Sequence, residues 1–551
     1  MERSPEEIVI AYHERTKHHV WRYAASLGYL DWATQPDPFR RYAGAPLVPL
    51  PLPPSGRALP YWQLHVPGGV PSEPLDLDSL SLFFRYGLSL TAWKQLGAAR
   101  WSLRANPSSG NLHPTEGYAL LPASSARDAE PALYHYAPQE HALEQRAVLE
   151  HTGWSELAAL LPRGSFLVAL TSIHWREAWK YGERAFRYCQ HDTGHALAAL
   201  RIGAAALGWK LAVVDGVEAA IVARILGLDR DADYPGAERE EAELLAVVTP
   251  GGSAARAALP TREVLGRLAA ATWHGSGNRL SREHAVDWPV IDEVARATRR
   301  SARAVRSEDF SGFPGEEELF GVPVRAGQRS AEQVILGRRS AVAMDGSTSI
   351  PRATFFRMLA RVVPARGGTA LPWDALATRP RIHLGLFVHR VEGLAPGLYA
   401  LARDPDKLEP LRRALAPAFL WKAVDDRPRG LPLYLLREMD CRALAARVSC
   451  GQDIAGDGAF SLAMIAEYLD TLVRHGAASY RDLFWEAGMI GQVLYLEAEA
   501  AGVRSTGIGC YFDDPVHDVF GISSRDWQSF YHFTVGGPVE DVRLTTLPAY
   551  E

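Results

Sequence analysis

Two stretches of the chain repeat the same pattern of small and apolar residues at helical spacing. Residues 192–208 read DTGHALAALRIGAAALG and residues 486–502 read EAGMIGQVLYLEAEAAG. Each stretch ends on glycine, the residue that most often follows the last turn of a helix because it adopts a left-handed backbone without steric cost. We therefore predict two long, largely buried helices, one in each half of the chain.

Shorter matches occur in the same order in both halves, which indicates a tandem duplication. They are ILGL and VFGI at residues 225–228 and 519–522, Leu-Tyr at 133–134 and 398–399, and Phe-Phe-Arg at 83–85 and 355–357. The offset between the halves grows after the Leu-Tyr match, so the second half is expected to carry an insertion. We place this insertion at residues 450–476, CGQDIAGDGAFSLAMIAEYLDTLVRHG.

Each half is predicted to contain a helix, a short strand, a polar turn, a further strand, the long helix and a final strand. The strand before the long helix is SFLVALTSI in the first half and LPLYLLREM in the second. The final strands are ELLAVVTPG and FYHFTVGGP. Helices and strands mixed in this order predict an α+β fold built in packed layers.

The domain limits follow from the repeat and from a loop-like stretch at 273–288, WHGSGNRLSREHAVDW, where Gly, Ser and Asn cluster. At 551 residues the chain exceeds the size of most single domains, which agrees with two repeats. We expect an N-terminal helix and Pro-rich wrapping arm at 1–74, a first domain at 75–272, a linker and entry to the second domain at 273–329, and the second domain at 330–551.

Charge and composition exclude several classes of partner. The formal net charge is −5 and no block of like charge occurs, so we expect neither nucleic acid nor a membrane surface as a partner. The four cysteines form no CxxC pair, and the charged N-terminal stretch contains no apolar signal core. We therefore expect a soluble cytoplasmic protein without transmembrane segments.

Two polar motifs are candidates for chemistry. The stretch SLRANPSSGNLHPTEGY at 102–118 places a turn rich in hydroxyl and amide groups before an apolar strand. Arg338, Arg339 and Ser340 combine two guanidinium groups with a hydroxyl, a set that suits a phosphate. Arginine pairs also occur on solvated faces in a chain this rich in arginine, so the residues alone leave both interpretations open.

Together these motifs resemble those of the FMN-dependent nitroreductase superfamily. RRSAVAMD resembles its phosphate motif, and NPSSGNLHP resembles the turn that contacts the flavin. The resemblance implies two tandem nitroreductase-like α+β domains that form an intrachain pseudo-dimer, as a monomer or within a homodimer, with FMN as the cofactor. The implied FMN contacts are Arg338, Arg339 and Ser340 at the phosphate, Pro107, Ser108, Ser109 and Asn111 at the isoalloxazine, Gly507, Gly509 and Cys510 beside the ring, and Arg543 as a late phosphate contact.

The two motifs are divided between the halves. The first half keeps the PSSGN turn but reads LPYWQLHVPGGVPSEPLDL where an arginine pair would precede it. The second half keeps the arginine pair but reads TALPWDALATRPRIHL at the place of the turn. The family often has a basic residue where this chain has Val342. A pseudo-dimer of these halves would have one complete site, so we expect one FMN per chain.

The stretch WKYGERAFRYCQHDTGHALAAL at 179–200 resembles that of SagB-type azoline dehydrogenases, a branch of the same superfamily. The resemblance implies Lys180 and Tyr181 as catalytic proton-transfer residues, because removal of a hydride from one carbon requires a base for the proton on its neighbour. The stretch taken as the counterpart in the second half, REMDCRALAARVS, has no such pair. Alternatively, Tyr181 and Arg184 are three residues apart and form an ordinary pair of neighbouring side chains on the surface of a helix.

Three further residues have open roles. His191 and His195 have the spacing of metal ligands on a helix, but no third ligand is evident, so we expect buried, hydrogen-bonded histidines and no metal. Glu116 is either a charged residue at a strand edge or a partner of the site.

The function that the resemblance implies is an FMN-dependent oxidoreductase. We expect a SagB-type dehydrogenase that transfers a hydride from a small-molecule or peptide-derived, azoline-like substrate to FMN, with oxygen or another acceptor reoxidising the flavin. The alternatives are a reductase of nitro, quinone or enone substrates that uses NAD(P)H as the electron donor, and a non-catalytic flavin-binding scaffold. Resemblance of fold does not determine the substrate.

Overall fold

The computed structural model describes residues 3–52, 58–123, 130–251, 262–301, 308–320, 329–366 and 370–550. Parts of the expected arm at 1–74 and of the expected linker at 273–329 lie outside these ranges. The chain divides into two compact units. Unit 1 contains residues 1–24, 307–329 and 333–544, and unit 2 contains residues 25–306, 330–332 and 545–551.

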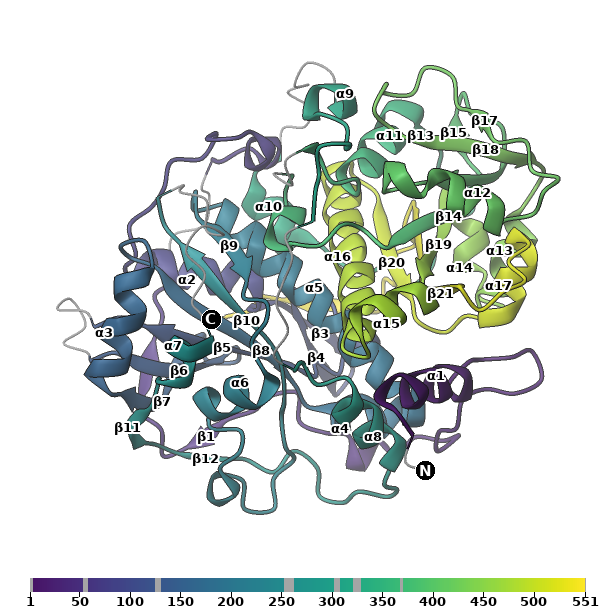
Figure 1. The fold of residues 1–551 in the computed structure, drawn as a ribbon. Coiled ribbons are helices and arrows are strands. Elements are labelled where there is room, and N and C mark those ends of the chain that lie inside the picture. Colours follow the sequence, from purple (N-terminus) through teal and green to yellow (C-terminus); the bar gives the residue numbers. More distant parts are fainter. Residues whose placement is uncertain are drawn as a thin grey trace. The chain divides into compact units, whose positions relative to one another are not determined.

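Unit 2 is built on an antiparallel sheet of eight strands (Figure 1). Its strands are β2 (Leu47–Pro49), β5 (Thr115–Leu121), β6 (Ala132–Ala137), β7 (Ala142–Leu149), β8 (Phe166–Ser172), β9 (Lys210–Val213), β10 (Glu241–Thr249) and β11 (Ala270–Trp273). Its larger helices are α2 (Leu77–Gly87), α3 (His151–Leu160), α4 (His174–Tyr181), α5 (Ala185–Ala205), α6 (Ala219–Leu226) and α8 (Pro289–Ala297). Every residue of β5 and β8 is buried, which explains the long apolar run of β8, FLVAL.

Unit 1 is built on an antiparallel sheet of seven strands. Its strands are β14 (Ile382–Val388), β16 (Gly397–Leu401), β17 (Lys422–Ala423), β18 (Leu433–Glu438), β19 (Phe460–Glu467), β20 (Arg504–Ile508) and β21 (Trp527–Gly536). Its larger helices are α1 (Pro5–Arg15), α11 (Arg352–Arg361), α12 (Leu408–Ala414), α13 (Arg442–Val448), α15 (Leu469–His475), α16 (Ser479–Ala500) and α17 (Asp513–Phe520).

The strand order confirms the duplication. The order is β7-β6-β5-β8-β10-β9 in unit 2 and β18-β16-β14-β19-β21-β20 in unit 1, so strands of the same rank along the chain occupy the same place in each sheet. The predicted long helices are α5 and α16, each of which lies between the fourth and fifth shared strands. The ILGL and VFGI motifs end α6 and α17 at left-handed glycines, Gly227 and Gly521.

The predicted position of the insertion is wrong. Residues 450–476 contain β19, which pairs with β14 as β8 pairs with β5, so this segment belongs to the shared core. The extra residues of the second half are 402–432, which include α12 and β17, whereas unit 2 joins β6 to β7 through residues 138–141. An apolar pattern identifies a buried strand but not its neighbour in the sheet, so the pattern of residues 450–476 does not distinguish a core strand from inserted chain.

Two of the predicted matches between the halves are also wrong, for the same reason. LPLYLLREM contains β18, the counterpart of β7, and is not the counterpart of SFLVALTSI, which contains β8. The counterpart of α4 is therefore α15, and not the stretch REMDCRALAARVS. The sequence of α15, LDTLVRH, also contains no Lys-Tyr pair.

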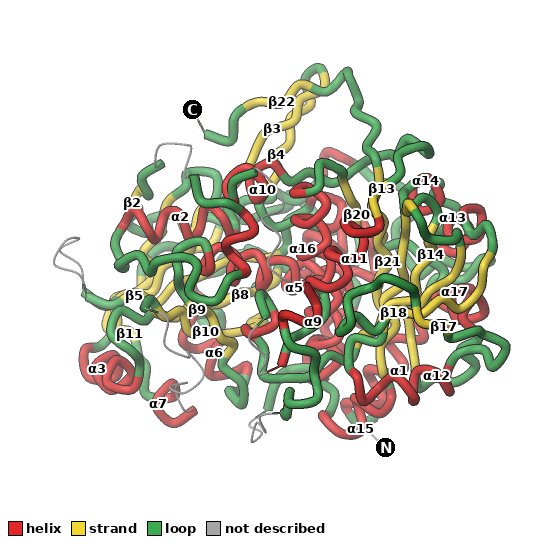
Figure 2. The backbone as a smooth tube through the Cα atoms, turned by 90° about the horizontal axis from the view of Figure 1, so that it is seen from above, coloured by secondary structure: helices red, strands yellow, loops and turns green. Residues whose placement is uncertain are grey.

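Each unit includes a short segment from the far end of the chain. Helix α1 begins at a capping box between Ser4 and Glu7, and its His13 lies 3.1 Å from the Tyr480 hydroxyl in unit 1. Strand β22 (Thr545–Leu547) extends the hairpin of β3 (Leu90–Leu96) and β4 (Ala99–Arg104) in unit 2, as Figure 2 shows. In the part of the chain that the structure describes, no helix combines the length and the apolar character needed to cross a bilayer.

Candidate active site

The PSSGN turn of unit 2 is held in shape by its own side chains. It contains a single turn of 3-10 helix at Ser109–Asn111, and Gly110, Asn111 and His113 all have positive φ. The Asn111 amide donates to the Ser102 carbonyl at 2.9 Å, and the His113 backbone N–H donates to the Ser108 hydroxyl at 2.8 Å. Gly or Asn adopts such conformations at low cost, which explains the composition of the turn.

Lys180 and Tyr181 lie directly against this turn. They end α4, and a Cβ atom placed on Gly110 would be 2.6 Å from the Tyr181 hydroxyl and 3.1 Å from the Lys180 Nζ. The Lys180 Nζ atom also lies 5.3 Å from the centre of the Tyr181 ring. Both side chains are half-buried. The structure thus brings together, within unit 2, two motifs that are 70 residues apart in the sequence.

Two buried carboxyl groups lie beneath the turn and the Lys-Tyr pair. Asp192 of α5 accepts hydrogen bonds from the Ser109 backbone N–H at 3.1 Å and from the Ser109 hydroxyl at 3.2 Å. Glu177 precedes Lys180 by one helical turn, and its carboxyl group contacts that of Asp192. Neither residue is more than 1 % exposed. These residues were not singled out from the sequence, because only the packing of α5 against α4 brings them to the turn.

Burial and mutual repulsion keep one proton on this pair. Burial raises the pKa of Asp192 to about 7 although Ser108 and Ser109 oppose the shift, and burial together with the charge of Asp192 raises the pKa of Glu177 well above its usual range. Two carboxylates in contact in a dry environment do not both ionise near neutral pH. Near neutral pH the pair next to Lys180 therefore carries at most one negative charge.

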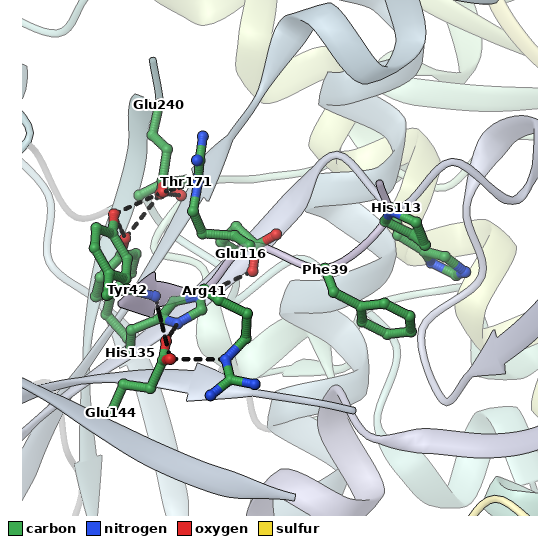
Figure 3. A network of polar contacts seen from close by, with 12 residues as sticks. Phe39, Arg41, Tyr42, His113, Glu116, His135, Glu144, Thr171 and Glu240 are labelled. Carbon is green, nitrogen blue, oxygen red and sulfur yellow. Dashed lines mark hydrogen bonds and ion pairs between the residues drawn. The ribbon is translucent and has the colours of Figure 1, made fainter. Parts of the chain in front are cut away.

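Glu116 is a buried member of an ionic network and not a charged residue at a strand edge. Figure 3 shows that His135 lies between two carboxylates, Glu116 at 2.9 Å and Glu144 at 2.8 Å. Although burial alone would lower the pKa of His135, these hydrogen bonds raise it to about 9. Burial alone would raise the pKa of Glu116, but Arg176 and His135 lower it to about 2. The network is thus ionised at neutral pH.

Arg176 connects this network to the turn. Its guanidinium donates to Glu116 and, at 2.7 Å, to the carbonyl of His113. Arg176 belongs to α4, so one helix supplies both the Lys-Tyr pair and the cation that holds the end of the turn. Nearby, Glu240 accepts hydrogen bonds from the hydroxyls of Tyr42 and Thr171, which fixes the adjoining strands (Figure 3).

In unit 1 the arginine pair forms a cluster with a third arginine. Arg338 is 4 % exposed, and burial, with Arg504 contributing, lowers its pKa. Burial and the charges of Arg338 and Arg504 lower the pKa of Arg339 to about 10. Arg504 begins β20, was not singled out from the sequence, and forms ion pairs with Glu499 and Glu540. Three guanidinium groups this close together repel one another, and a bound anion would relieve that repulsion.

Tyr495 of α16 connects the arginine cluster to β20. The Arg338 guanidinium lies 5.0 Å from the centre of the Tyr495 ring, and the Ser340 hydroxyl donates to the Tyr495 hydroxyl at 3.0 Å. The Gly507 backbone N–H donates to the same hydroxyl at 2.9 Å. A Cβ on Gly507 would lie 1.8 Å from the Tyr531 hydroxyl, so only glycine fits there. Arg338, Ser340 and Gly507 are thus close together within unit 1.

The remaining predicted flavin contacts of unit 1 are Gly509, Cys510 and Arg543. Gly509 and Cys510 follow β20, and the Cys510 sulfur lies 2.9 Å from that of Cys450. The Arg543 guanidinium is mostly exposed and is held by Asp541, and among the described residues no contact joins it to the arginine cluster. Val342 is 72 % exposed.

The histidines with metal-ligand spacing are buried in α5. His191 and His195 are each 1 % exposed. Within the described ranges no group of three His, Cys, Asp or Glu side chains is arranged to hold a metal ion.

The donor set of unit 1 fits the phosphate of FMN. The cluster of Arg338, Arg339 and Arg504 offers guanidinium groups whose burial and mutual repulsion favour a bound dianion, and the Ser340 hydroxyl lies at the same place.

Comparison with known proteins identifies the family. The model of the nitroreductase family matches residues 91–237 and 336–537, one region in each half of the chain. Among solved structures, a proposed nitroreductase from Anabaena variabilis is 22% identical with a TM-score of 0.68, and the match covers 97% of this chain and 99% of that one. This likeness shows that the fold is shared over almost the whole length of both chains.

Two more distant matches carry no inference because their TM-scores are low. A proposed nitroreductase from Ralstonia eutropha is 15% identical with a TM-score of 0.28, covering 43% of this chain and 93% of that one. A chain of the E. coli microcin synthetase McbBCD complex with truncated pro-MccB17 bound is 17% identical with a TM-score of 0.25, covering 44% and 92%. No curated protein sequence matches significantly. Since the two matched regions make up more than half of the sequence, this chain belongs to the nitroreductase family.

Proposed function

We propose that the protein is an FMN-dependent dehydrogenase of the SagB type, which oxidises an azoline-like ring in a small molecule or a modified peptide. The observation that carries this proposal is the contact between the Lys180-Tyr181 pair and the PSSGN turn, above a pair of buried carboxyl groups. A turn of this kind contacts the flavin in the family that the sequence resembles. Oxidation of a carbon–carbon bond of such a ring by hydride transfer requires a base beside the flavin, because the neighbouring carbon loses its hydrogen as a proton.

The proposed cofactor contacts come from both halves of the sequence. Arg338, Arg339, Ser340 and Arg504 would hold the phosphate, and the turn at 107–111 would face the isoalloxazine. FMN, when bound, supplies the hydride acceptor. Because each half of the sequence has only one of the two motifs, the proposal includes one FMN per chain.

In this proposal Lys180 and Tyr181 take the proton that leaves the substrate with the hydride. The negative charge of the Glu177-Asp192 pair next to Lys180 would balance the positive charge that the base acquires in that step. The Ser109 hydrogen bonds to Asp192 keep the turn fixed on this pair. The chain thus provides both a base and a nearby store for the proton.

The test is anaerobic reduction of the bound flavin by a synthetic peptide that contains a thiazoline ring. We expect bleaching of the flavin absorbance and a product with two fewer hydrogens, and Lys180→Ala is expected to slow bleaching about 100-fold or more. Lys94→Ala is the matched control, because Lys94 lies on β3 and contacts Thr546. Fast bleaching by NADPH with no azole formed would contradict the dehydrogenase and favour a reductase.

A further inference from the structure

Two cysteines of unit 1 face one another across neighbouring segments. Cys450 follows α13 and Cys510 follows β20, and their sulfur atoms are 2.9 Å apart. Both are thiols in the structure. A disulfide bond is about 2.05 Å long, so a movement of less than about 1 Å would bring these sulfurs to bonding distance.

The backbone on both sides of the cysteines is already joined by hydrogen bonds. The Phe512 N–H donates to the Val448 carbonyl at 2.8 Å. The Gln452 amide donates to the Cys510 carbonyl at 2.8 Å. These bonds lie two residues to either side of Cys450, so the two segments are fixed in register where the thiols meet. The two segments are thus already aligned, and the sulfurs need to move by less than about 1 Å before a bond forms.

The pair is also accessible, unlike the other two cysteines. Cys450 and Cys510 are half-buried, whereas Cys189 and Cys441 are fully buried. The hydroxyl of Tyr23, a residue that is 50% exposed, forms a hydrogen bond with the Cys450 thiol. A small oxidant in water can thus reach the pair, and exposure of this kind distinguishes reactive from inert thiols.

We propose that Cys450 and Cys510 are a redox modification site that a hydroperoxide converts to a disulfide. One thiolate attacks the peroxide and becomes a sulfenic acid, releasing water, or an alcohol when the peroxide is organic. The second thiolate then attacks the sulfenic sulfur, and water leaves as the S–S bond forms. Overall, two thiols and one hydrogen peroxide give one disulfide and two waters, so the cysteines lose two electrons and two protons to the peroxide.

The disulfide would tether the loop that follows β20. That loop contains Gly509 and continues from Gly507, two residues that the resemblance to the nitroreductase superfamily implies lie beside the flavin ring. We expect the oxidised chain to release FMN more slowly than the reduced chain, because the loop can no longer move away from residue 450. This consequence rests on the proposed function, whereas formation of the disulfide does not.

The test begins with the full-length chain, reduced and freed of reductant. Hydrogen peroxide at low molar excess is expected to lower the thiol count of the denatured protein from four to two and its mass by about 2 Da, without formation of disulfide-linked dimers. Peptide mapping is expected to find residues 450 and 510 in one cross-linked peptide. Dithiothreitol should restore all four thiols.

Variants separate the pair from general oxidation. Cys450→Ser and Cys510→Ser should each abolish the cross-link and leave a sulfenic acid that dimedone traps on the remaining cysteine. Cys441→Ala, which removes a buried thiol elsewhere in unit 1, should leave the cross-link intact. A thiol count that stays at four, or a cross-link that involves Cys189 or Cys441, would overturn the proposal. If the cross-link forms but FMN release is unchanged, the modification site stands and the assignment of the β20 loop to the flavin fails.

Discussion

At the scale of single residues, the carboxyl pair of Glu177 and Asp192 has the largest expected effect on pH behaviour. Burial raises the pKa of Asp192 to about 7, from about 4 when unfolded. The folded state therefore binds more protons than the unfolded state between these values, and stability falls as the pH rises through this window. In Asp192→Asn this fall between pH 5 and 8 should be smaller, as measured by the midpoint of thermal unfolding. An equally steep fall in the variant would show that Asp192 is ionised at all these pH values.

A second prediction at this scale concerns the contact between the turn and the Lys-Tyr pair. Gly110 and Gly97 have almost the same φ, 58° and 57°, but only Gly110 has side chains within 4 Å of the position of a Cβ. Gly97→Ala should cost about 1 kcal/mol of unfolding free energy through backbone strain alone. Gly110→Ala should cost more, because it also displaces Tyr181 or Lys180. Equal costs in urea unfolding would mean that Tyr181 does not lie against the turn.

The sequence predicted some of these residues and not others for a physical reason. The turn at 107–111 and the pair at 180–181 are short, local motifs that a resemblance can identify. Glu177, Asp192 and Arg504 act through partners that are distant in the sequence, and only the packed fold brings them together. Their residue types alone gave no signal, since acidic and basic side chains of this kind are mostly solvated.

At the scale of elements, the ionic network of Glu116, His135 and Glu144 fastens β5, β6 and β7 to one another. The pKa of His135 is raised to about 9 from an ordinary value of 6.5, so its contribution to stability is fully present below pH 6.5 and is lost as the pH rises through 9. The native protein should therefore lose stability between pH 7 and 10. His135→Gln should be destabilised at pH 7 by about 3 kcal/mol or more, because it leaves buried carboxylates without their cation.

The pH dependence distinguishes this network from simple packing. The cost of His135→Gln in chemical unfolding is expected to be smaller at pH 10 than at pH 7, since the imidazole is already neutral there. His284→Gln is a suitable control, because His284 forms a single contact with a carboxylate, Glu238 at 3.0 Å, and is partly exposed. A cost for His135→Gln that is the same at both pH values would contradict the ionised network.

The helices and strands themselves could be predicted from the sequence more reliably than the pairing of the strands. The long helices α5 and α16 follow from helical spacing and from their terminal glycines, and both are present. Strand β19 lies inside the predicted insertion, because an apolar run shows that a strand is buried but not which strand it pairs with. The real insertion at 402–432 is Pro-rich and mixes charged with apolar residues, so its pattern does not distinguish it from the shared elements.

At the scale of the whole molecule, duplication is the main feature. Two units share one strand order, each includes a segment from the opposite end of the chain, and each contains a different one of the two motifs that resemble the family's flavin contacts. The turn and the Lys-Tyr pair belong to unit 2, and the arginine cluster belongs to unit 1. Because the halves have diverged in this way, the sequence contains only one complete set of motifs. We therefore propose one FMN per chain.

The most direct test of this account is the amount of FMN bound per chain. The protein is saturated with FMN, freed of excess cofactor, denatured, and the released flavin is compared with the protein concentration. We predict a value close to one, which falls towards zero in the double variant Arg338→Ala, Arg339→Ala. A value close to two, or no bound FMN in the native protein, would contradict the account.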